Sequence, residues 1–218
     1  EVRFNGVDYC VSDLQRSVIV QSRDELIVNV LKKYFSESGI SKQGLVFCVN
    51  VRHAESMAER LNQAGIISAA VSGKNAADAA ESIERYQRGE IRFLCSCSLL
   101  NEGFDSPCTS VLVMARPTMS KALYVQQLGR GTRKWPGKES LYVIDVVDQH
   151  GPLNAPWSVH ALFGAGAYCP WSDVLDMKHA PVPEEEILVR LLEYERRIEE
   201  IDIFTFESGK VVSHKKLN

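Results

Sequence analysis

The sequence predicts an α/β fold in which an open, parallel sheet is flanked by helices on both faces. Short apolar segments alternate with amphipathic segments between residues 43 and 147. The apolar segments are hydrophobic throughout, which is typical of strands that are buried on both faces. Helical segments separate most of them, as expected where crossover helices join parallel strands.

The expected strands are short runs rich in aliphatic residues, too short to form buried helices. They cover residues 45–49, 67–71, 91–95, 111–115 and 141–147. Helices are expected where apolar residues recur at spacings of three and four. These helices cover residues 23–35, 54–65, 76–88 and 120–128.

Three regions follow from this pattern. Residues 1–22 are expected to form a linker segment, residues 23–150 the α/β domain, and residues 151–218 an irregular and helical C-terminal extension. Five prolines lie between residues 151 and 183, which indicates a turn-rich chain. Residues 184–201 carry an apolar stripe at helical spacing on an acidic segment, so we expect a solvated helix that packs on its own domain or on a neighbour.

The composition restricts the function classes. The chain has 218 residues, with 45% hydrophobic and 24% charged residues, as in ordinary globular proteins. Its net charge of −3 does not itself indicate a nucleic-acid partner, although a local basic face could still bind one. No apolar run approaches the roughly 18 residues that cross a bilayer. For this reason we expect no membrane partner. The six cysteines form no C-x-x-C pair, so we expect reduced thiols and no metal site. We expect an intracellular protein, cytoplasmic or nucleoid-associated, with an organellar location left open.

Ligands of open parallel sheets bind beyond the carboxyl ends of the strands, so we expect the functional loops there. One candidate loop covers residues 101–107. In this loop Gly103 permits close approach of a ligand, Asp105 supplies an acceptor and Pro107 fixes the turn. The same residue pattern also occurs in purely structural turns.

A more specific candidate covers residues 126–133. Arg130 and Arg133 are three residues apart at the end of a predicted helix, so their guanidinium groups can converge on one point. Two planar, permanently charged groups suit the oxygens of a phosphate. Gly129 and Gly131 remove side-chain bulk between the arginines, which a merely solvated surface would not require.

The chain nevertheless has no recognisable phosphate-binding loop of its own. The segment from Gly131 to Lys138 resembles one, but five residues rather than four separate Gly131 from Gly137. Glu139 also occupies the position where a Ser or Thr would hold magnesium. The sequence therefore combines arginines that suit a phosphate with no loop to cradle it.

These segments resemble the second RecA-like lobe of superfamily 2 helicases of the DEAD/DEAH-like type. Residues 45–49 resemble its motif IV, Glu102-Gly103-Phe104-Asp105-x-Pro107 its motif V, and Gln126-x-x-Gly129-Arg130-x-x-Arg133 its motif VI. The resemblance covers residues 23–150. It implies a RecA-like fold without its own phosphate loop, with ATP bound between two lobes and Mg²⁺ held by the other, N-terminal lobe.

The resemblance also implies roles for individual residues. Arg130 and Arg133 would contact the γ-phosphate and stabilise the charge that develops in the transition state, and Gln126 would help to organise this region. Gly103, Asp105 and Gly129 would lie near the nucleotide. Contacts to the nucleic-acid backbone would come from the loops that follow the strands. These contact residues are Asn50, Arg52, Ser72, Lys74 and Ser98.

Departures from the family pattern favour DNA over RNA. Glu102 stands where DEAD-box RNA helicases usually have Arg, and Arg116-Pro117-Thr118 precedes the helix of motif VI. Both features are similar to DNA-acting members, namely the motors of restriction enzymes and the mitochondrial branch-migration type. Cys97 replaces the usual Thr at the start of motif V, so the contact made there is left open.

We therefore expect the C-terminal motor lobe of an ATP-dependent helicase or translocase that acts on DNA and supplies half of the active site. The partner would be the N-terminal lobe of a longer protein, of which this chain, beginning at Glu1, would be a fragment. The alternatives are an RNA helicase lobe and a non-catalytic docking module derived from such a lobe. A small-molecule α/β binder or transferase is a further alternative, but it leaves the arginine pair unexplained.

Overall fold

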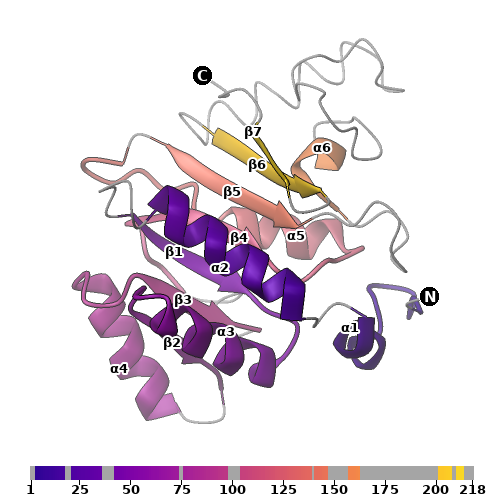
Figure 1. Cartoon of the computed structure of the whole chain (residues 1–218), viewed down its shortest axis with the longest axis horizontal. Coiled ribbons are helices and arrows are strands. Elements are labelled where there is room, and N and C mark those ends of the chain that lie inside the picture. The colour runs from indigo at the N-terminus through magenta and orange to yellow at the C-terminus, as the bar shows by residue number, and fades with distance from the viewer. Residues whose placement is uncertain are drawn as a thin grey trace.

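The computed structural model describes residues 3–17, 21–35, 42–73, 76–97, 104–138, 140–146, 157–162, 201–207 and 210–213. Within these ranges helices and strands alternate along most of the chain (Figure 1). The helices are α1 (Val11–Ser17), α2 (Gln21–Phe35), α3 (Val51–Gln63), α4 (Ala76–Gln87), α5 (Lys121–Leu128) and α6 (Val159–Leu162). The strands are β1 (Gln43–Phe47), β2 (Ser68–Val71), β3 (Phe93–Ser96), β4 (Thr109–Met114), β5 (Leu141–Val146), β6 (Ile201–Glu207) and β7 (Lys210–Ser213).

The strands form one sheet in the order β2-β3-β1-β4-β5-β6-β7. All neighbours from β2 to β6 are parallel, and β7 pairs antiparallel with β6. The predicted parallel sheet is therefore confirmed for the five strands between residues 43 and 146. From β1 the chain continues to β2 at one side of the sheet, and from β4 it continues to β5 at the other side. The direction in which strands are added therefore reverses between the neighbours β1 and β4.

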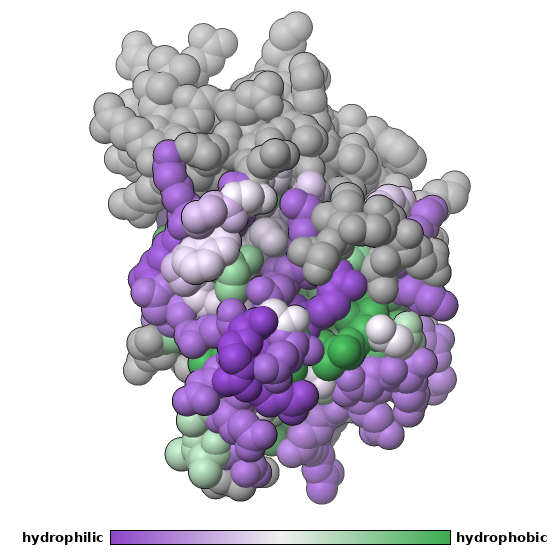
Figure 2. Space-filling model, turned by 90° about the vertical axis from the view of Figure 1, so that its left-hand side faces the viewer, coloured by the Kyte–Doolittle hydropathy of each residue, from purple (hydrophilic) through white to green (hydrophobic). Residues whose placement is uncertain are grey.

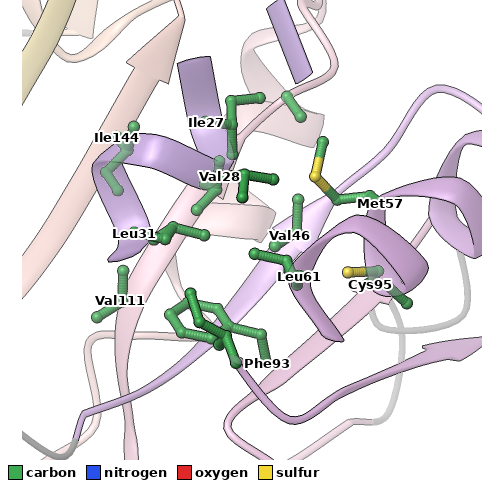
Figure 3. Packing of buried hydrophobic residues seen from close by; sticks show 14 of the residues in the cluster. Ile27, Val28, Leu31, Val46, Met57, Leu61, Phe93, Cys95, Val111 and Ile144 are labelled. Carbon is green, nitrogen blue, oxygen red and sulfur yellow. The ribbon is translucent and has the colours of Figure 1, made fainter. Parts of the chain in front are cut away.

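Helices cover both faces of this sheet, as predicted. Successive residues of a strand point to opposite faces, so Val111 and Val113 of β4 belong to one hydrophobic cluster and Leu112 to the other. The first face packs against α2 and α3, where Leu31 and Met57 are buried (Figure 3). The second face packs against α4, α5 and α6. These two cores fix the positions of the loops at the strand ends.

The C-terminal region differs from the prediction where it is described. The expected helix over residues 184–201 lies outside the described residues except for Ile201, which is the first residue of β6. The expectation of a helix is wrong at this residue. The segment from Ile201 to Glu207 is rich in β-branched and aromatic residues, which favours a strand. Strand β6 extends the sheet beside β5.

The segment before α2 contains structure that the sequence did not predict. Helix α1 follows a short bridge between Phe4 and Tyr9. Tyr9 and Leu14 are buried against Val49, which follows β1. The segment therefore packs on the carboxyl end of the sheet.

A buried carboxylate fastens this segment to the loop that leads into α5. Asp8 accepts hydrogen bonds from Arg116 Nη2 at 2.8 Å and from the backbone N–H of Met119 at 2.8 Å. Arg116 and Met119 both lie between β4 and α5. None of the helices in the described ranges is long and apolar enough to span a membrane.

Candidate functional site

The candidate arginines lie in the segment of residues 129–138 between α5 and β5, which we call the arginine loop. The loop lies at the amino ends of the strands, because Gly131 is buried against Leu141, the first residue of β5. Our expectation of a position at the carboxyl ends was wrong. A chain that leaves a crossover helix must return to the amino edge of the sheet before the next parallel strand begins.

Segment 104–108 lies at the same edge, immediately before β4. Arg130 Nη1 donates a hydrogen bond to the carbonyl oxygen of Phe104 at 2.6 Å. Arg133 Nη1 forms an ion pair with Asp105 Oδ1. The two guanidinium groups therefore meet adjacent residues, and the structure brings the two predicted loops together.

Segment 104–108 is anchored in the core. Phe104 is buried and packs against Tyr86 of α4, with ring centroids 6.3 Å apart. The hydroxyl groups of Tyr86 and Thr109 are hydrogen-bonded at 2.9 Å. Gln87 Nε2 donates to the carbonyl oxygen of Asp105 at 3.3 Å. Arg130 thus binds a carbonyl group whose position the core determines.

The ion pair between Arg133 and Asp105 lies at the surface. The side chain of Arg133 is 49% exposed and that of Asp105 is 60% exposed. Figure 2 views the side of the molecule where the strands begin and shows mainly hydrophilic side chains on that face. Exposed ion pairs contribute at most about 1 kcal/mol, so an anion can replace the carboxylate at small cost.

The other residues that were predicted to lie near the nucleotide differ in exposure. Gln126 is exposed on α5, and Gly129 is exposed at the C-cap of the same helix. Gly103 lies outside the described residues. Trp135 is 51% exposed in the arginine loop, so it adds an aromatic surface beside the charged residues.

Lys138 is a member of the site that the sequence did not reveal. Its Nζ donates hydrogen bonds to the carbonyl oxygens of Gly131 at 2.5 Å, Arg133 at 2.8 Å and Pro107 at 3.4 Å. Burial lowers the pKa of this amine to about 8. The sequence carries no signal for this role, because it depends on contacts that only the folded chain makes.

Helix α5, which leads into the arginine loop, is attached to the sheet by a buried carboxylate. Asp145 of β5 accepts hydrogen bonds from the Tyr124 hydroxyl at 2.8 and 3.0 Å and from the backbone N–H of Val159 at 2.9 Å. Burial raises the pKa of Asp145 to about 6, although these hydrogen bonds oppose the shift. Asp145 therefore joins β5, α5 and α6.

The predicted nucleic-acid residues lie at the opposite, carboxyl edge of the sheet. Asn50 and Arg52 follow β1 and Ser72 follows β2, whereas Lys74 and Ser98 lie outside the described residues. Arg52 is exposed, and Asn50 and Ser72 are half-buried. The structure does not bring this group together with the arginine loop.

A buried pair that the sequence did not reveal supports the loop after β1. His53 Nδ1 accepts a hydrogen bond from the backbone N–H of Val49 at 3.1 Å, so the ring proton lies on Nε2 and faces Asp24 Oδ1 at 3.1 Å. Asn50 caps α3, because its Oδ1 accepts from the backbone N–H of His53 at 2.7 Å. The side-chain oxygen of Asn50 thus has a structural role.

The residues present suit phosphate and sugar groups better than a metal ion. The arginine loop offers guanidinium donors for phosphate oxygens, and Asp105 offers an exposed acceptor for a hydroxyl group. Within the described part of the chain, no group of three or more His, Cys, Asp or Glu side chains could hold a metal ion.

Comparison with known proteins identifies relatives of this chain. The protein family described as helicase conserved C-terminal domain matches residues 24–134. The helicase IRC3 of Saccharomyces cerevisiae is 26% identical over 159 residues, which cover 72% of this chain and 23% of IRC3. The endonuclease subunit of the type I restriction enzyme EcoKI from Escherichia coli is 29% identical over 165 residues, which cover 68% of this chain and 14% of that subunit. The chain thus spans less than a quarter of either relative.

Solved structures share the fold. A fragment of an HsdR subunit of a type I restriction enzyme from Vibrio vulnificus has a TM-score of 0.57 and 21% identity, covering 88% of this chain and 33% of that one. The C-terminal domain of the DEAD-box protein Dbp5 has a TM-score of 0.50 and 15% identity, covering 62% and 75%. These likenesses confirm the RecA-like sheet. Because the family match spans half of its length, this chain belongs to the helicase conserved C-terminal domain family.

Proposed function

We propose that this chain is the second motor lobe of an ATP-dependent helicase or translocase that acts on DNA. Arg130 and Arg133 act as arginine fingers on an ATP molecule whose phosphates and Mg²⁺ are held by an N-terminal RecA-like lobe of the same protein. The observation that carries the proposal is the meeting of both guanidinium groups with adjacent residues, Phe104 and Asp105, at one edge of the sheet.

The two arginines have different tasks. Arg130 is oriented by the carbonyl group of Phe104, which the core holds in place, so its guanidinium group is preorganised. Arg133 exchanges the carboxylate of Asp105 for the γ-phosphate when the two lobes close. Asp105 then accepts a hydrogen bond from the ribose, and Gln126 and Gly129 border the phosphates. ATP supplies the phosphoryl group, and its transfer to water develops negative charge that the arginines stabilise.

Contacts to the nucleic acid come from the opposite edge of the sheet. In this proposal Asn50, Arg52, Ser72, Lys74 and Ser98 bind the phosphate backbone, which positions a strand without reading its sequence. DNA is favoured by Glu102 and by Arg116-Pro117-Thr118, and also by the relative that is named as a restriction endonuclease subunit.

The domain organisation belongs to the same proposal. Residues 23–150 form the motor lobe, residues 1–22 the linker and residues 151–218 an extension. Two contacts refine these boundaries, because residues 8–14 pack on the lobe and β6 adds a strand to its sheet. An intracellular location follows from action on DNA, whether cytoplasmic, nucleoid-associated or organellar.

The experiment measures ATP turnover by the protein that joins this chain to its N-terminal lobe. Arg130→Ala and Arg133→Ala are each expected to lower kcat by about 10³-fold or more while ATP still binds, because an arginine finger acts on the transition state. Arg85→Ala is the matched control, since Arg85 is an exposed arginine of α4 paired with Glu90. Unchanged turnover in both variants would remove the arginines from the mechanism. A wild-type protein without any ATP turnover would instead favour a docking module.

A further inference from the structure

We propose that Lys138 is a positioning residue that holds the arginine loop against segment 104–108 and so places Arg133 for the γ-phosphate. The inference deepens the proposed function and rests on the role given there to Arg133. Lys138 itself does not reach the nucleotide in this account. It acts only through the backbone of the loop.

The contacts of Lys138 match the donors of a protonated amine. An ammonium group has three N–H donors, and three carbonyl oxygens surround this one. Two of them, Gly131 O at 2.5 Å and Arg133 O at 2.8 Å, belong to the arginine loop. The third, Pro107 O at 3.4 Å, belongs to the segment that also contains Asp105. Lys138 therefore links three positions of the arginine loop and joins the loop to segment 104–108.

Lys138 holds the exposed part of the loop together with two weaker contacts, namely the surface ion pair of Arg133 with Asp105 and the hydrogen bond from Thr132 Oγ1 to Gly129 O at 3.1 Å. Residues 132–137 are half-buried or exposed, and the buried anchor of the loop is Gly131. Lys138 binds the carbonyl group of Arg133 itself, so it fixes the backbone from which the guanidinium group extends. A displacement of about 1 Å in a catalytic group can cost about a hundredfold in rate.

The charge of Lys138 makes this fastening sensitive to pH. The pKa of Lys138 is lowered to about 8, mainly by burial; Cys108 in segment 104–108 opposes this shift, and Lys42 before β1 adds a smaller effect in the same direction as burial. A neutral amine keeps only two N–H donors and loses the strength that a charge adds to its hydrogen bonds. We therefore expect the loop to be held firmly below pH 8 and to loosen as the pH rises above it.

The test compares the pH profiles of kcat in the two-lobe protein. In the wild type, kcat is expected to fall as the pH rises through about 8, with KM for ATP nearly unchanged. Lys138→Arg keeps its charge at all these pH values, so its kcat relative to the wild type should rise above pH 8. Lys138→Met is expected to lower kcat about tenfold at pH 7 and to lose the decline near pH 8. A wild-type profile that stays flat to pH 9, or a Lys138→Met variant with wild-type kcat, would overturn the proposal.

A second measurement separates this inference from the proposed function. Amide hydrogen exchange of residues 130–134 in the 218-residue chain reports on the loop without nucleotide. Exchange, corrected for the intrinsic pH dependence, is expected to be several-fold faster in Lys138→Met than in the wild type, and equal rates would refute the positioning role. If Arg130→Ala and Arg133→Ala left turnover unchanged, the proposed function would fail, and the exchange data would still decide whether Lys138 holds the loop.

Discussion

Replacing Asp145 with asparagine removes the titration of a carboxyl group that lies in the core between β5 and α5. Asp145 is 3% exposed and accepts hydrogen bonds from Tyr124 and Val159. Burial raises its pKa from 3.8 to about 6. The folded state therefore binds more protons at Asp145 than the unfolded state does between these values. The contribution of Asp145 to stability is present below about pH 4 and is lost as the pH rises through 6.

The magnitude follows from the shift. A rise of about two pKa units corresponds to about 3 kcal/mol, because each unit is worth about 1.4 kcal/mol. The side-chain amide of the Asp145→Asn variant cannot ionise, but its oxygen can still accept a hydrogen bond. We expect the free energy of unfolding of Asp145→Asn, relative to the wild type, to increase by about 3 kcal/mol between about pH 4 and pH 7.

The assay is urea denaturation of the 218-residue chain at a series of pH values, with the difference between variant and wild type as the readout. Tyr124→Phe provides a second variant with an opposite change. It removes a hydroxyl that stabilises the carboxylate, so the pKa of Asp145 should rise further and the loss of stability should occur at higher pH. A difference between Asp145→Asn and the wild type that stays constant from pH 4 to pH 7 would refute the reasoning.

Two further predictions concern the two edges of the sheet. Gly131→Ala should lower the free energy of unfolding by about 1–3 kcal/mol, because the new Cβ would collide with Leu141 and lie 3.0 Å from Leu112 Cδ1. Gly73→Ala meets nothing within 4 Å and should change it by less than about 0.5 kcal/mol; equal effects in urea denaturation would contradict the packing argument. Arg52→Ala should weaken the binding of a fluorescent DNA strand by the two-lobe protein, as measured by fluorescence anisotropy. The slope of log K against log salt concentration should become shallower by about one, which corresponds to one lost phosphate contact. Arg88→Ala, which removes an exposed arginine just after α4, should leave DNA binding unchanged, and an equal loss in both variants would indicate a non-specific effect.

The parallel sheet could be predicted because its strands are buried on both faces. Residues 45–49 and 111–115 are continuous apolar runs, and the observed strands Gln43–Phe47 and Thr109–Met114 begin two residues earlier. Strand β6 could not be predicted from the helical stripe of residues 184–201, because this stripe includes Ile201 and the aromatic residues that favour a strand lie beyond it. Helix α1 has only seven residues, and the segment that contains it is stabilised by Asp8 and by packing against Val49, neither of which a local pattern reveals.

The candidate site was predictable only in part. The spacing of Arg130 and Arg133 is visible in the sequence, although both residues lie beyond the end of α5 at Leu128. The contacts that hold them are not visible, since Lys138 reaches Pro107 across 31 residues and Asp145 reaches Tyr124 across 21. Their importance arises from burial and tertiary contact. The edge of the sheet at which the loop lies follows from the parallel pairing of β4 and β5, because the chain returns to the amino edge before β5 begins.

The most direct test of the central claim compares two ligands on the two-lobe protein, namely ADP and ADP with aluminium fluoride, which imitates the transferred phosphoryl group. The wild type should bind the transition-state mimic at least about a hundredfold more tightly than ADP. Arg130→Ala and Arg133→Ala should lose most of this difference while their affinity for ADP stays the same. If both variants kept the full preference for the mimic, or lost affinity for both ligands equally, the arginines would not act on the transferred phosphate.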